Sequence, residues 1–297
     1  MSIPPRCGTL CRPAPGPSRD APEAISSPGH SSRPSDKMTE IKGKTVLVTG
    51  ASAGIGEATA RAFATLGANL VLCARRVERL ADLKAELEGA HGITVRIHGL
   101  DVRDRDAVEQ FVSGLQSDGI VPDVLVNNAG KAVGLDLLHE GLVEDWEEMI
   151  DTNVKGLLYL SRAVVPLMVK RDSGHVVNIG SIAGHQVYQK GAVYNASKYA
   201  VRALNEGMSL DLLGTRIKVS SIDPGLVETE FSVVRFHGVE ERADTVYQGY
   251  QPLRPEDIAD IITFVVTRPE HVNILDVVVL PTAQRSAHMV HKETPAD

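Results

Sequence analysis

The chain has 297 residues, 43% of them hydrophobic, and a formal net charge of -7. This length and apolar content suffice for a full hydrophobic core. The acidic balance argues against a nucleic-acid or membrane-surface function, because both favour a basic face. No apolar run is long enough to predict a transmembrane helix. Three cysteines without a CxxC or Cys/His cluster indicate a reduced, cytoplasmic setting, and no metal site is expected.

Residues 1–37 differ from the rest in composition. They are rich in Pro, Ser, Gly and Arg and lack apolar periodicity, which predicts a disordered tail. The arginines would suit a transit peptide, but Asp20, Glu23 and the missing amphipathic face oppose that interpretation. Met38 stands just before the predicted domain, so a later start is also compatible with the sequence. We expect this tail to be dispensable.

From residue 44 onward, short β-branched segments alternate with segments of helical periodicity. The predicted strands are KTVLVTG (44–50), ANLVLCARR (68–76), ITVRIHGLDV (93–102), PDVLVNNAG (122–130), HVVNIGS (175–181), IKVSSIDPG (217–225) and ILDVVVLP (274–281). The first predicted helices are 57–67, 77–90 and 107–115. This alternation predicts an α/β fold, a single Rossmann-type, doubly wound domain with a seven-stranded parallel sheet flanked by helices. We place this domain at 38–285 and a flexible C-terminal tail at 286–297.

Three glycines mark the passage from the first strand into the first helix. Gly50, Gly54 and Gly56 form a GxxxGxG pattern, at the point where a helix N-terminus can receive a phosphate. Turns also use glycine, so the triplet alone is weak evidence. Its position after the first strand of an alternating chain favours dinucleotide binding.

The end of the second strand carries Arg75 and Arg76 and no acidic residue. An NAD site usually places Asp or Glu there for the ribose hydroxyls, whereas guanidinium groups pair with phosphate. We therefore expect NADP as cofactor, with Arg75 on the 2′-phosphate and Arg76 stacking on adenine or assisting. Alternatively, both arginines simply begin the solvated face of the next helix.

Further motifs follow in order: LDV at 100–102, NNAG at 127–130, DTNVKG at 151–156, IGS at 179–181, YNASK at 194–198 and DPGLVET at 223–229. Together with TGASAGIG at 49–56, they make the chain resemble the short-chain dehydrogenases/reductases over residues 42–284. The resemblance implies hydride transfer to or from a nicotinamide cofactor.

One Tyr/Lys pair fits this chemistry. Tyr194 and Lys198 are four residues apart and would share a helix face, whereas Tyr188 and Tyr199 have no lysine four residues on. The resemblance implies that Tyr194 is the general acid/base, and that Lys198 lowers the Tyr194 pKa and holds the nicotinamide ribose. It also implies that Ser181 donates a hydrogen bond to the substrate oxygen. We expect Tyr188 to line the substrate pocket and Tyr199 to pack in the helix.

The resemblance adds a fourth catalytic residue and the remaining cofactor contacts. Asn153 is expected to hold a water that links Lys198 to a proton relay, although a capping or packing amide is the alternative. The implied cofactor contacts are Ser52 and Ile55 in the glycine loop, Asp101 and Val102 beside adenine, Asn128, Ala129 and Gly130 on the adenosine side, and Pro224, Gly225, Val227 and Thr229 near the nicotinamide amide.

The C-terminal half is similar to the NADP-dependent 3-hydroxy acid dehydrogenases, which implies small 3-hydroxy acids, serine among them, as substrates. A carboxylate substrate requires a cation, and Arg235 is our candidate, with Gln186 as a neutral helper. Alternatively, Arg235 holds an interface or pairs with Glu240 or Glu241.

Two other functions compete with this one. A broad carbonyl reductase of the same fold would need no carboxylate site, and a cofactor-binding sensor would not turn over; the intact set of catalytic residues opposes the sensor. The resemblance also implies a homotetramer, in which the apolar last strand meets a neighbouring subunit.

Overall fold

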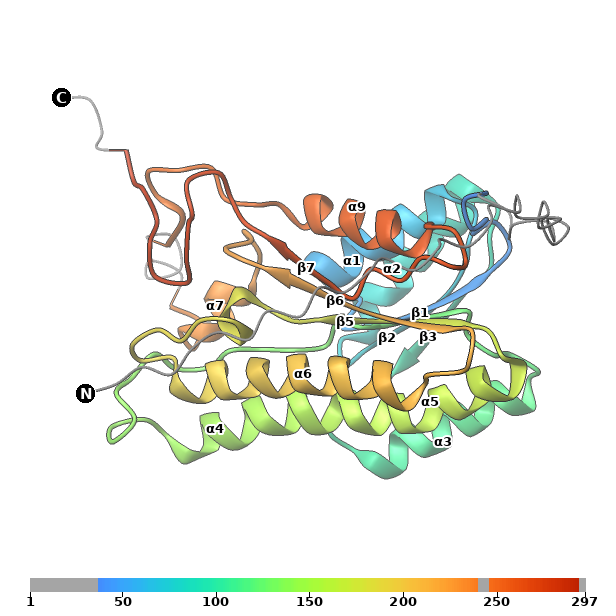
Figure 1. Ribbon diagram of the computed structural model, residues 1–297, viewed down its shortest axis with the longest axis horizontal. Helices are drawn as coiled ribbons and strands as arrows, with labels where there is room; N and C mark the ends of the chain where they lie inside the picture. The colour runs from blue at the N-terminus through green and yellow to red at the C-terminus, as the bar shows by residue number, and fades with distance from the viewer. Residues whose placement is uncertain (1–36, 240–245, 294–297) are drawn as a thin grey trace, which may run out of the picture. The chain divides into compact units, whose positions relative to one another are not determined.

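A seven-stranded parallel sheet organises the residues that the computed structural model describes, 37–239 and 246–293. Its strand order is β3-β2-β1-β4-β5-β6-β7 (Figure 1). The strands are β1 Thr45–Thr49, β2 Asn69–Ala74, β3 Val95–Gly99, β4 Val124–Asn127, β5 Gly174–Ile179, β6 Ile217–Pro224 and β7 Asp276–Val279. The predicted seven-stranded, Rossmann-type α/β sheet is confirmed.

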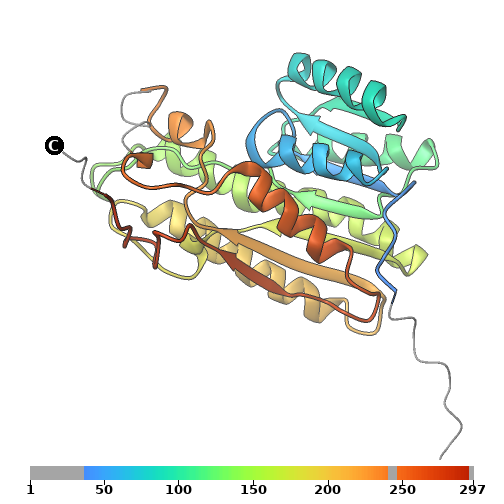
Figure 2. The same cartoon turned by 90° about the horizontal axis from the view of Figure 1, so that it is seen from above.

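Helices cover both faces of this sheet. They are α1 Gly54–Thr65, α2 Val77–His91, α3 Arg105–Ser117, α4 Val143–Ile150, α5 Leu157–Arg171, α6 Ala192–Asp211, α7 Phe231–Arg235 and α9 Pro255–Val266, with a π-helix η1 at Asp151–Gly156 and a 3-10 turn η2 at Ile182–Gly184. In Figures 1 and 2, α1, α2 and α9 lie on one face and α3, α4, α5 and α6 on the other.

Each face of the sheet carries its own hydrophobic core, because successive strand residues point to opposite faces. In β1, Val46 and Val48 pack with Phe63 of α1 and Ile258 of α9, whereas Leu47 belongs to the core formed with α3 and α5. A strand buried on both faces needs apolar residues at consecutive positions. This requirement explains the continuous runs in the sequence.

The strand order reverses beside β1, which pairs with β2 on one side and β4 on the other. In open α/β sheets, ligands bind at such a switch point, outside the carboxyl ends of the strands. The loops that follow β1, β2, β4, β5 and β6 all leave the sheet at this end, because the strands are parallel.

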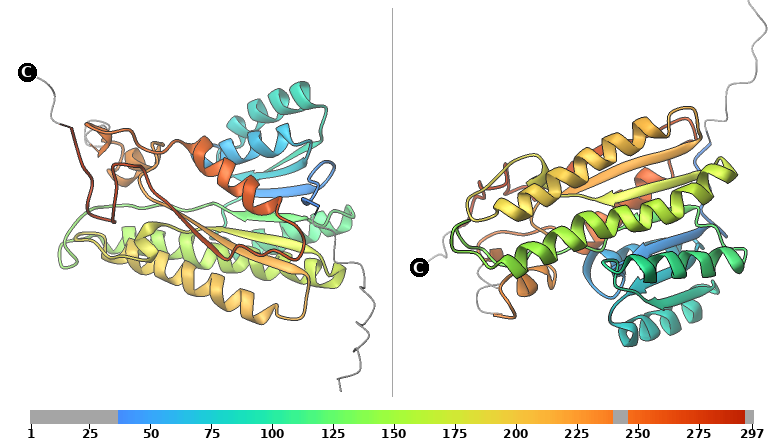
Figure 3. Two further views of the ribbon diagram at one scale, coloured as in Figure 1. Left: turned by 45° about the horizontal axis from the view of Figure 1, so that its top comes forward. Right: turned by 90° about the horizontal axis from the view of Figure 1, so that it is seen from below.

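The C-terminal residues return toward this end after edge strand β7 (Figures 1 and 3). Gln284 and Val290 form an antiparallel bridge, and the Glu293 amide donates to the Gly249 carbonyl at 2.7 Å. Residues 286–293, which the sequence suggested as part of a flexible tail, therefore make specific contacts. The predicted N-terminal tail, apart from Lys37, and residues 294–297 lie outside the described residues. Within the described chain, no helix is long and apolar enough to span a membrane.

Candidate active site

Two adjoining cavities lie at the carboxyl end of the sheet. The first, here called the glycine-loop cavity, measures about 330 Å³ and is lined by the turn after β1 and by the ends of β2, β3 and β4. The second, the tyrosine cavity, measures about 440 Å³ and is lined by Ser181, Tyr194 and the chain after β6. Ile55, Thr229 and Phe231 line both cavities. An extended ligand could therefore occupy the two together.

The glycine loop has the backbone geometry of a phosphate site. Gly50 and Gly54 have φ angles of 64° and 54°, and a Cβ on Gly56 would lie 2.4 Å from the Gly50 carbonyl oxygen. The side-chain amide of Asn128 donates to the carbonyls of Thr49 and Gly50 at 2.8 and 3.2 Å, which fixes the loop. The first residues of α1 have no side-chain cap, so backbone amides at the positive helix end can receive an anion.

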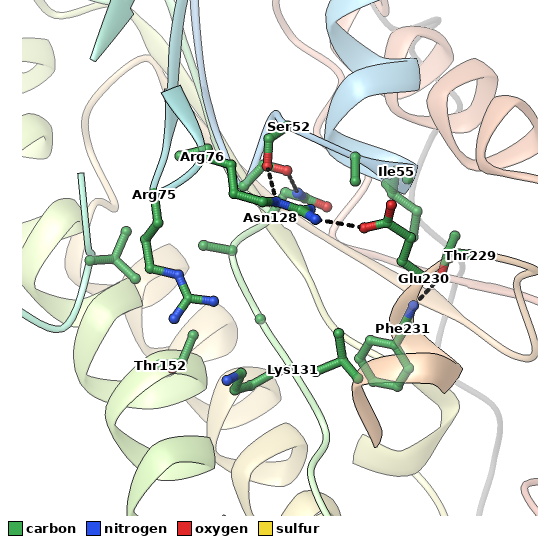
Figure 4. Close-up of a pocket in the computed structure, with 18 of the residues that line it drawn as sticks. Ser52, Ile55, Arg75, Arg76, Asn128, Lys131, Thr152, Thr229, Glu230 and Phe231 are labelled. Carbon is green, nitrogen blue, oxygen red and sulfur yellow. Dashed lines mark hydrogen bonds and ion pairs between the residues drawn. The ribbon is translucent and has the colours of Figure 1, made fainter. Parts of the chain in front are cut away.

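The two arginines after β2 have different surroundings (Figure 4). Arg76 is held by Glu230 at 2.9 Å and by Ser52 at 3.4 Å, and Arg79 binds the other oxygen of Glu230 at 2.7 Å. Arg75 lines the cavity without a hydrogen bond to any described residue, and its guanidinium points into the space beside the sheet. Arg75 is therefore the guanidinium most readily offered to a phosphate.

The charged side chains of Asp101 and Lys131, which line this cavity, are already paired. Lys131 lies 2.5 Å from Glu148, and Arg103 bonds Asp101 at 2.6 Å and Glu148 at 3.4 Å. The hydrogen bond from Arg103 lowers the pKa of Asp101, so this carboxylate stays ionised. Because these cations are neutralised locally, they compete less with Arg75 for an added anion.

Most residues predicted to bind the cofactor line one of the two cavities. The glycine-loop cavity is lined by Gly50, Ser52, Gly54, Ile55, Arg75, Arg76, Asp101, Val102, Asn128, Ala129, Gly130 and Thr229. The tyrosine cavity is lined by Pro224, Gly225 and Val227. Gly56 lines neither, and its missing side chain instead allows close packing against Gly50 and Asn128.

Ser181, Tyr194 and Lys198 come together where β5 meets α6. Ser181 follows β5 and caps η2, since its hydroxyl oxygen accepts from the Ala183 amide at 3.1 Å. Tyr194 and Lys198 are one turn apart on α6; the Lys198 ammonium lies 5.9 Å from the Tyr194 ring centroid and donates to the Ile179 carbonyl at 2.9 Å. The predicted Tyr/Lys pair thus shares one helix face beside Ser181.

Burial dominates the protonation of this pair. It raises the pKa of Tyr194 above its ordinary value, and the hydrogen bond with Ser181 and the charge of Arg235 only partly oppose it. Burial also lowers the pKa of Lys198 to about 8. In the protein alone, desolvation of the phenolate outweighs nearby positive charge, so the net pKa of Tyr194 is raised; a lowering by Lys198 together with a bound, positively charged nicotinamide ring stays a prediction. Tyr194 is protonated at neutral pH and suited to donate a proton.

Asn153 lies in the π-helix η1, a local widening that often marks functional sites. Its carbonyl oxygen accepts from the Lys131 amide at 2.8 Å, and its amide nitrogen donates to the Lys131 carbonyl at 2.8 Å and to Ser197 at 3.0 Å. These bonds join the loop after β4 to α6. They account for the side chain as a packing amide, and its part in a water relay remains a prediction.

The predicted substrate residues separate into two groups. Arg235 donates to the Tyr188 hydroxyl at 2.9 Å, and its guanidinium lies 5.4 and 5.8 Å from the ring centroids of Tyr188 and Tyr194. Gln186 is not among the lining residues of the tyrosine cavity, and its side-chain oxygen accepts from the Ala287 amide at 3.0 Å. Tyr199 does not pack inside the helix: it is 40% exposed, and its hydroxyl donates to the His185 carbonyl.

Sequence reasoning missed several residues of the two cavities. The tyrosine cavity is also lined by Leu135, Gln189, Leu226, Phe231, Ser232, Phe236, Val246, Tyr247, Ala287 and His288, and the glycine-loop cavity by Lys131 and Glu230. Lys131 directly follows the NNAG motif and could have been found from that position. Leu226 lies within the DPGLVET motif, and Phe231 and Ser232 lie in α7 just after it. The places of the remaining residues are set by tertiary packing, and no local pattern marks them.

Relatives with named activities match this chain over most of its length. The short chain dehydrogenase family model matches residues 44–239. An NADP-dependent 3-hydroxy acid dehydrogenase of Salmonella typhi is 49% identical over 249 residues, which cover 83% of this chain and 99% of the relative. Its counterpart from Schizosaccharomyces pombe is 41% identical over 86% of this chain and 99% of the relative.

Solved structures give the same result. The closed form of a serine dehydrogenase complexed with NADP+ has a TM-score of 0.79 and 46% identity, covering 84% of this chain and all (100%) of that one. An alcohol dehydrogenase of the archaeon Thermococcus sibiricus, complexed with 5-hydroxy-NADP, has a TM-score of 0.72 and 29% identity over 82% of this chain and 99% of that one. The chain belongs to the short-chain dehydrogenase family of oxidoreductases.

Proposed function

We propose that the protein is an NADP-dependent dehydrogenase that interconverts a small 3-hydroxy acid and its 3-oxo acid. The observation that carries this proposal is the position of Arg235. Its guanidinium lies 5.8 Å from the Tyr194 ring centroid, and its Nε is buried without a hydrogen-bond partner among the described residues. A buried hydrogen-bond donor without a partner destabilises the protein unless a bound ligand accepts its hydrogen bond.

A 3-hydroxy acid fits this arrangement because one carbon separates its carbinol carbon from its carboxylate. With the hydroxyl at Ser181 and Tyr194, the carboxylate would extend toward Arg235, and guanidinium–carboxylate pairing is among the strongest charge-assisted contacts. Tyr188 supports the arginine through its hydroxyl. Glu240 and Glu241, the alternative partners of Arg235, lie outside the described residues. The names of the relatives support the same substrate class.

The residues of the glycine-loop cavity fit NADP. Uncapped amides at the start of α1 would hold the pyrophosphate, and Arg75 would hold the 2′-phosphate, with Arg76 assisting. Lys198 would contact the nicotinamide ribose, and Pro224, Gly225, Val227 and Thr229 would line the nicotinamide end. When bound, NADP accepts or donates the hydride.

The protein's own residues then handle the proton. In the reducing direction, Ser181 donates a hydrogen bond to the substrate carbonyl oxygen, and Tyr194, protonated at neutral pH, transfers its proton to that oxygen. In the oxidising direction, Tyr194 first passes its own proton to the amine form of Lys198, and its phenolate oxygen then takes the hydroxyl proton of the substrate. Lys198 is the nearby group whose pKa, about 8, allows it to exchange protons near neutral pH. Asn153 joins Lys131 and Ser197 around this dyad and is proposed to hold the water of the relay.

A substrate panel tests the proposal. Serine, 3-hydroxyisobutyrate and a neutral alcohol with its ketone would each be assayed with NADP and NAD, following the reduced nicotinamide by absorbance. Preference for the two acids with NADP is the expected result. Equal or better turnover of the neutral pair would establish a general carbonyl reductase, and no turnover of any compound would favour a binding protein.

We also propose a cytoplasmic homotetramer. Edge strand β7 exposes Val278 at 44%, and Phe264 on the neighbouring α9 is 48% exposed. A second subunit packed across a two-fold axis would cover these side chains. Light scattering is expected to give a tetramer and Val278→Asp a smaller species; a monodisperse wild-type monomer at micromolar concentration would contradict the assembly. Cys73, the described cysteine, is a free thiol, as a reducing compartment requires.

A further inference from the structure

A buried carboxylate beneath the catalytic pair has no part in the steps above. Asp223, near the end of β6, is 1% exposed. Its Oδ1 accepts from the Ser221 hydroxyl at 2.7 Å, and its Oδ2 lies 2.7 Å from His185 Nε2. Asp276 on β7 completes the group, with its Oδ2 3.8 Å from the same His185 nitrogen. A buried carboxylate loses its hydration and destabilises the fold unless hydrogen bonds or a nearby positive charge compensate for that loss.

Glycine at position 180 makes room for this carboxylate. A Cβ on Gly180 would lie 1.6 Å from Asp223 Oδ1, so no larger residue could stand there. The preceding residue, Ile179, provides the carbonyl that accepts from Lys198 Nζ at 2.9 Å. The Asp223 carboxylate therefore lies beside the peptide that anchors the catalytic ammonium.

The turn that carries His185 is packed on the same part of α6. A Cβ on Gly184 would lie 2.7 Å from the Lys198 carbonyl oxygen, and the Tyr199 hydroxyl donates to the His185 carbonyl at 2.7 Å. His185 is thus held between α6 and the Asp223 carboxylate. The side chain of His185 is 16% exposed and that of Asp276 is 34% exposed, so these two side chains lie between the buried Asp223 carboxylate and solvent.

We propose that Asp223 is a positioning residue whose negative charge keeps Lys198 in its ammonium form and sets the pH at which the Tyr194–Lys198 pair exchanges its proton. The proposal rests on the assignment of Tyr194 and Lys198 as the catalytic pair. Asp223 acts through Lys198 and does not itself contact the substrate.

The charge of Asp223 changes the pKa of Lys198 and the pKa of Tyr194 in the same direction. Its negative charge raises the pKa of Lys198 against the larger, opposite effect of burial, and it adds to the effects that raise the pKa of Tyr194. Removing that charge should lower both pKa values, so activity that depends on the deprotonated pair should appear at lower pH.

The remaining groups around the site have defined roles. Burial and a hydrogen bond with Asp223 raise the pKa of Asp276 to about 6, which is still below the pKa of about 8 of Lys198, so Asp276 is ionised where Lys198 exchanges its proton. The charges of His185 and of Arg202, which lies on α6, partly oppose this increase and lower the pKa of Asp276. Tyr188 raises the pKa of Tyr194 and Arg235 lowers it. Both residues line the tyrosine cavity and are unchanged in the variants below.

The test is the pH profile of kcat/KM for oxidation, measured with NADP on the wild type and on Asp223→Asn. The variant is expected to shift the inflection down by about one pH unit. Asp211→Asn, at the exposed end of α6, removes the same formal charge away from the site and should leave the inflection unchanged. A purely structural role would lower activity without moving the inflection.

A second pair of variants leaves the buried residue intact. Asp276→Lys places an ammonium beside Asp223 from the edge strand and should shift the inflection downward, whereas Asp276→Asn should shift it by less than half as much. Inflections identical to the wild type in both Asp223→Asn and Asp276→Lys would overturn the role of Asp223, and an equal shift in Asp211→Asn would do the same.

The outcome is separable from the proposed function. A wild type that fails to oxidise any hydroxy acid contradicts the proposed substrate class, and the profiles are then recorded with the neutral pair that the panel identifies. An active wild type whose variants keep its inflection contradicts Asp223 alone.

Discussion

The glycine-loop cavity and the tyrosine cavity are built in different ways. Most residues that line the first lie at or just after the ends of β1 to β4, and the rest are Thr152, Thr229, Glu230, Phe231 and Val234. The second combines the end of β5 with Tyr188, Arg235, Tyr247 and His288, which lie on segments outside the sheet. A rigid sheet fixes the first, whereas packing between loops fixes the second. Variants should therefore affect cofactor and substrate separately, except at Ile55, Thr229 and Phe231, which line both cavities.

The largest effect is expected at Tyr194, in the tyrosine cavity. Tyr194→Phe should lower turnover by at least about three orders of magnitude, because the proton donor is lost, while NADPH binding stays near wild type. Steady-state kinetics and fluorescence titration with NADPH check the two expectations. Tyr188→Phe is the matched control and should retain most of its turnover. A Tyr194→Phe enzyme with a tenth of wild-type activity would move the proton transfer to another group.

The next effect should be confined to the glycine-loop cavity. Arg75→Asp combined with Arg76→Ala should change the NADP/NAD ratio of kcat/KM by about a hundredfold and reverse the preference, because a phosphate partner is replaced by a repulsive charge. The measurement is kcat/KM with each cofactor at one saturating substrate concentration. Arg79→Ala, which removes only a partner of Glu230, should leave the ratio nearly unchanged. An unaltered ratio in the double variant would place the 2′-phosphate elsewhere.

A smaller effect should be confined to the tyrosine cavity. Removing residues 286–297 takes away Ala287 and His288 from its wall and the bond between Gln186 and Ala287. The substrate KM is expected to rise about three- to tenfold, because part of the enclosure is lost together with the hydrogen bonds of this segment, among them Ala287 to Gln186 and Glu293 to Gly249. NADPH affinity, measured by titration, should not change. A weaker NADPH affinity would show that the two cavities are not independent.

The smallest effect concerns the N-terminal segment. Deletion of residues 1–36 should leave the melting temperature and kcat/KM within experimental scatter of the full chain. A loss of many degrees in the melting temperature would mean that this segment stabilises the domain.

The same contrast explains what the sequence could predict. Positions relative to strands and helix turns were enough to predict the places of several site residues. Gly50, Arg75 and Ser181 come just after strands, and Tyr194 and Lys198 are one turn apart on α6. Gln186 and Tyr199 were assigned by position alone, and tertiary packing directed one toward Ala287 and the other toward the His185 carbonyl.

The protonation of the catalytic pair was also beyond sequence reasoning. The spacing of Tyr194 and Lys198 predicts their proximity but not their burial, and burial decides the direction of both pKa shifts. Asp223 was visible only as part of the DPG motif. Its contacts with His185 and Asp276 join three segments that are far apart in the chain.

Arg235 is proposed to select a substrate carboxylate beside Tyr194. The most direct measurement compares kcat/KM for 3-hydroxyisobutyrate with that for its neutral methyl ester, in the wild type and in Arg235→Gln. The wild type is expected to prefer the acid, and Arg235→Gln is expected to lose about a hundredfold in kcat/KM on the acid while changing little on the ester. Equal losses on acid and ester, or a wild type that prefers the ester, would contradict it.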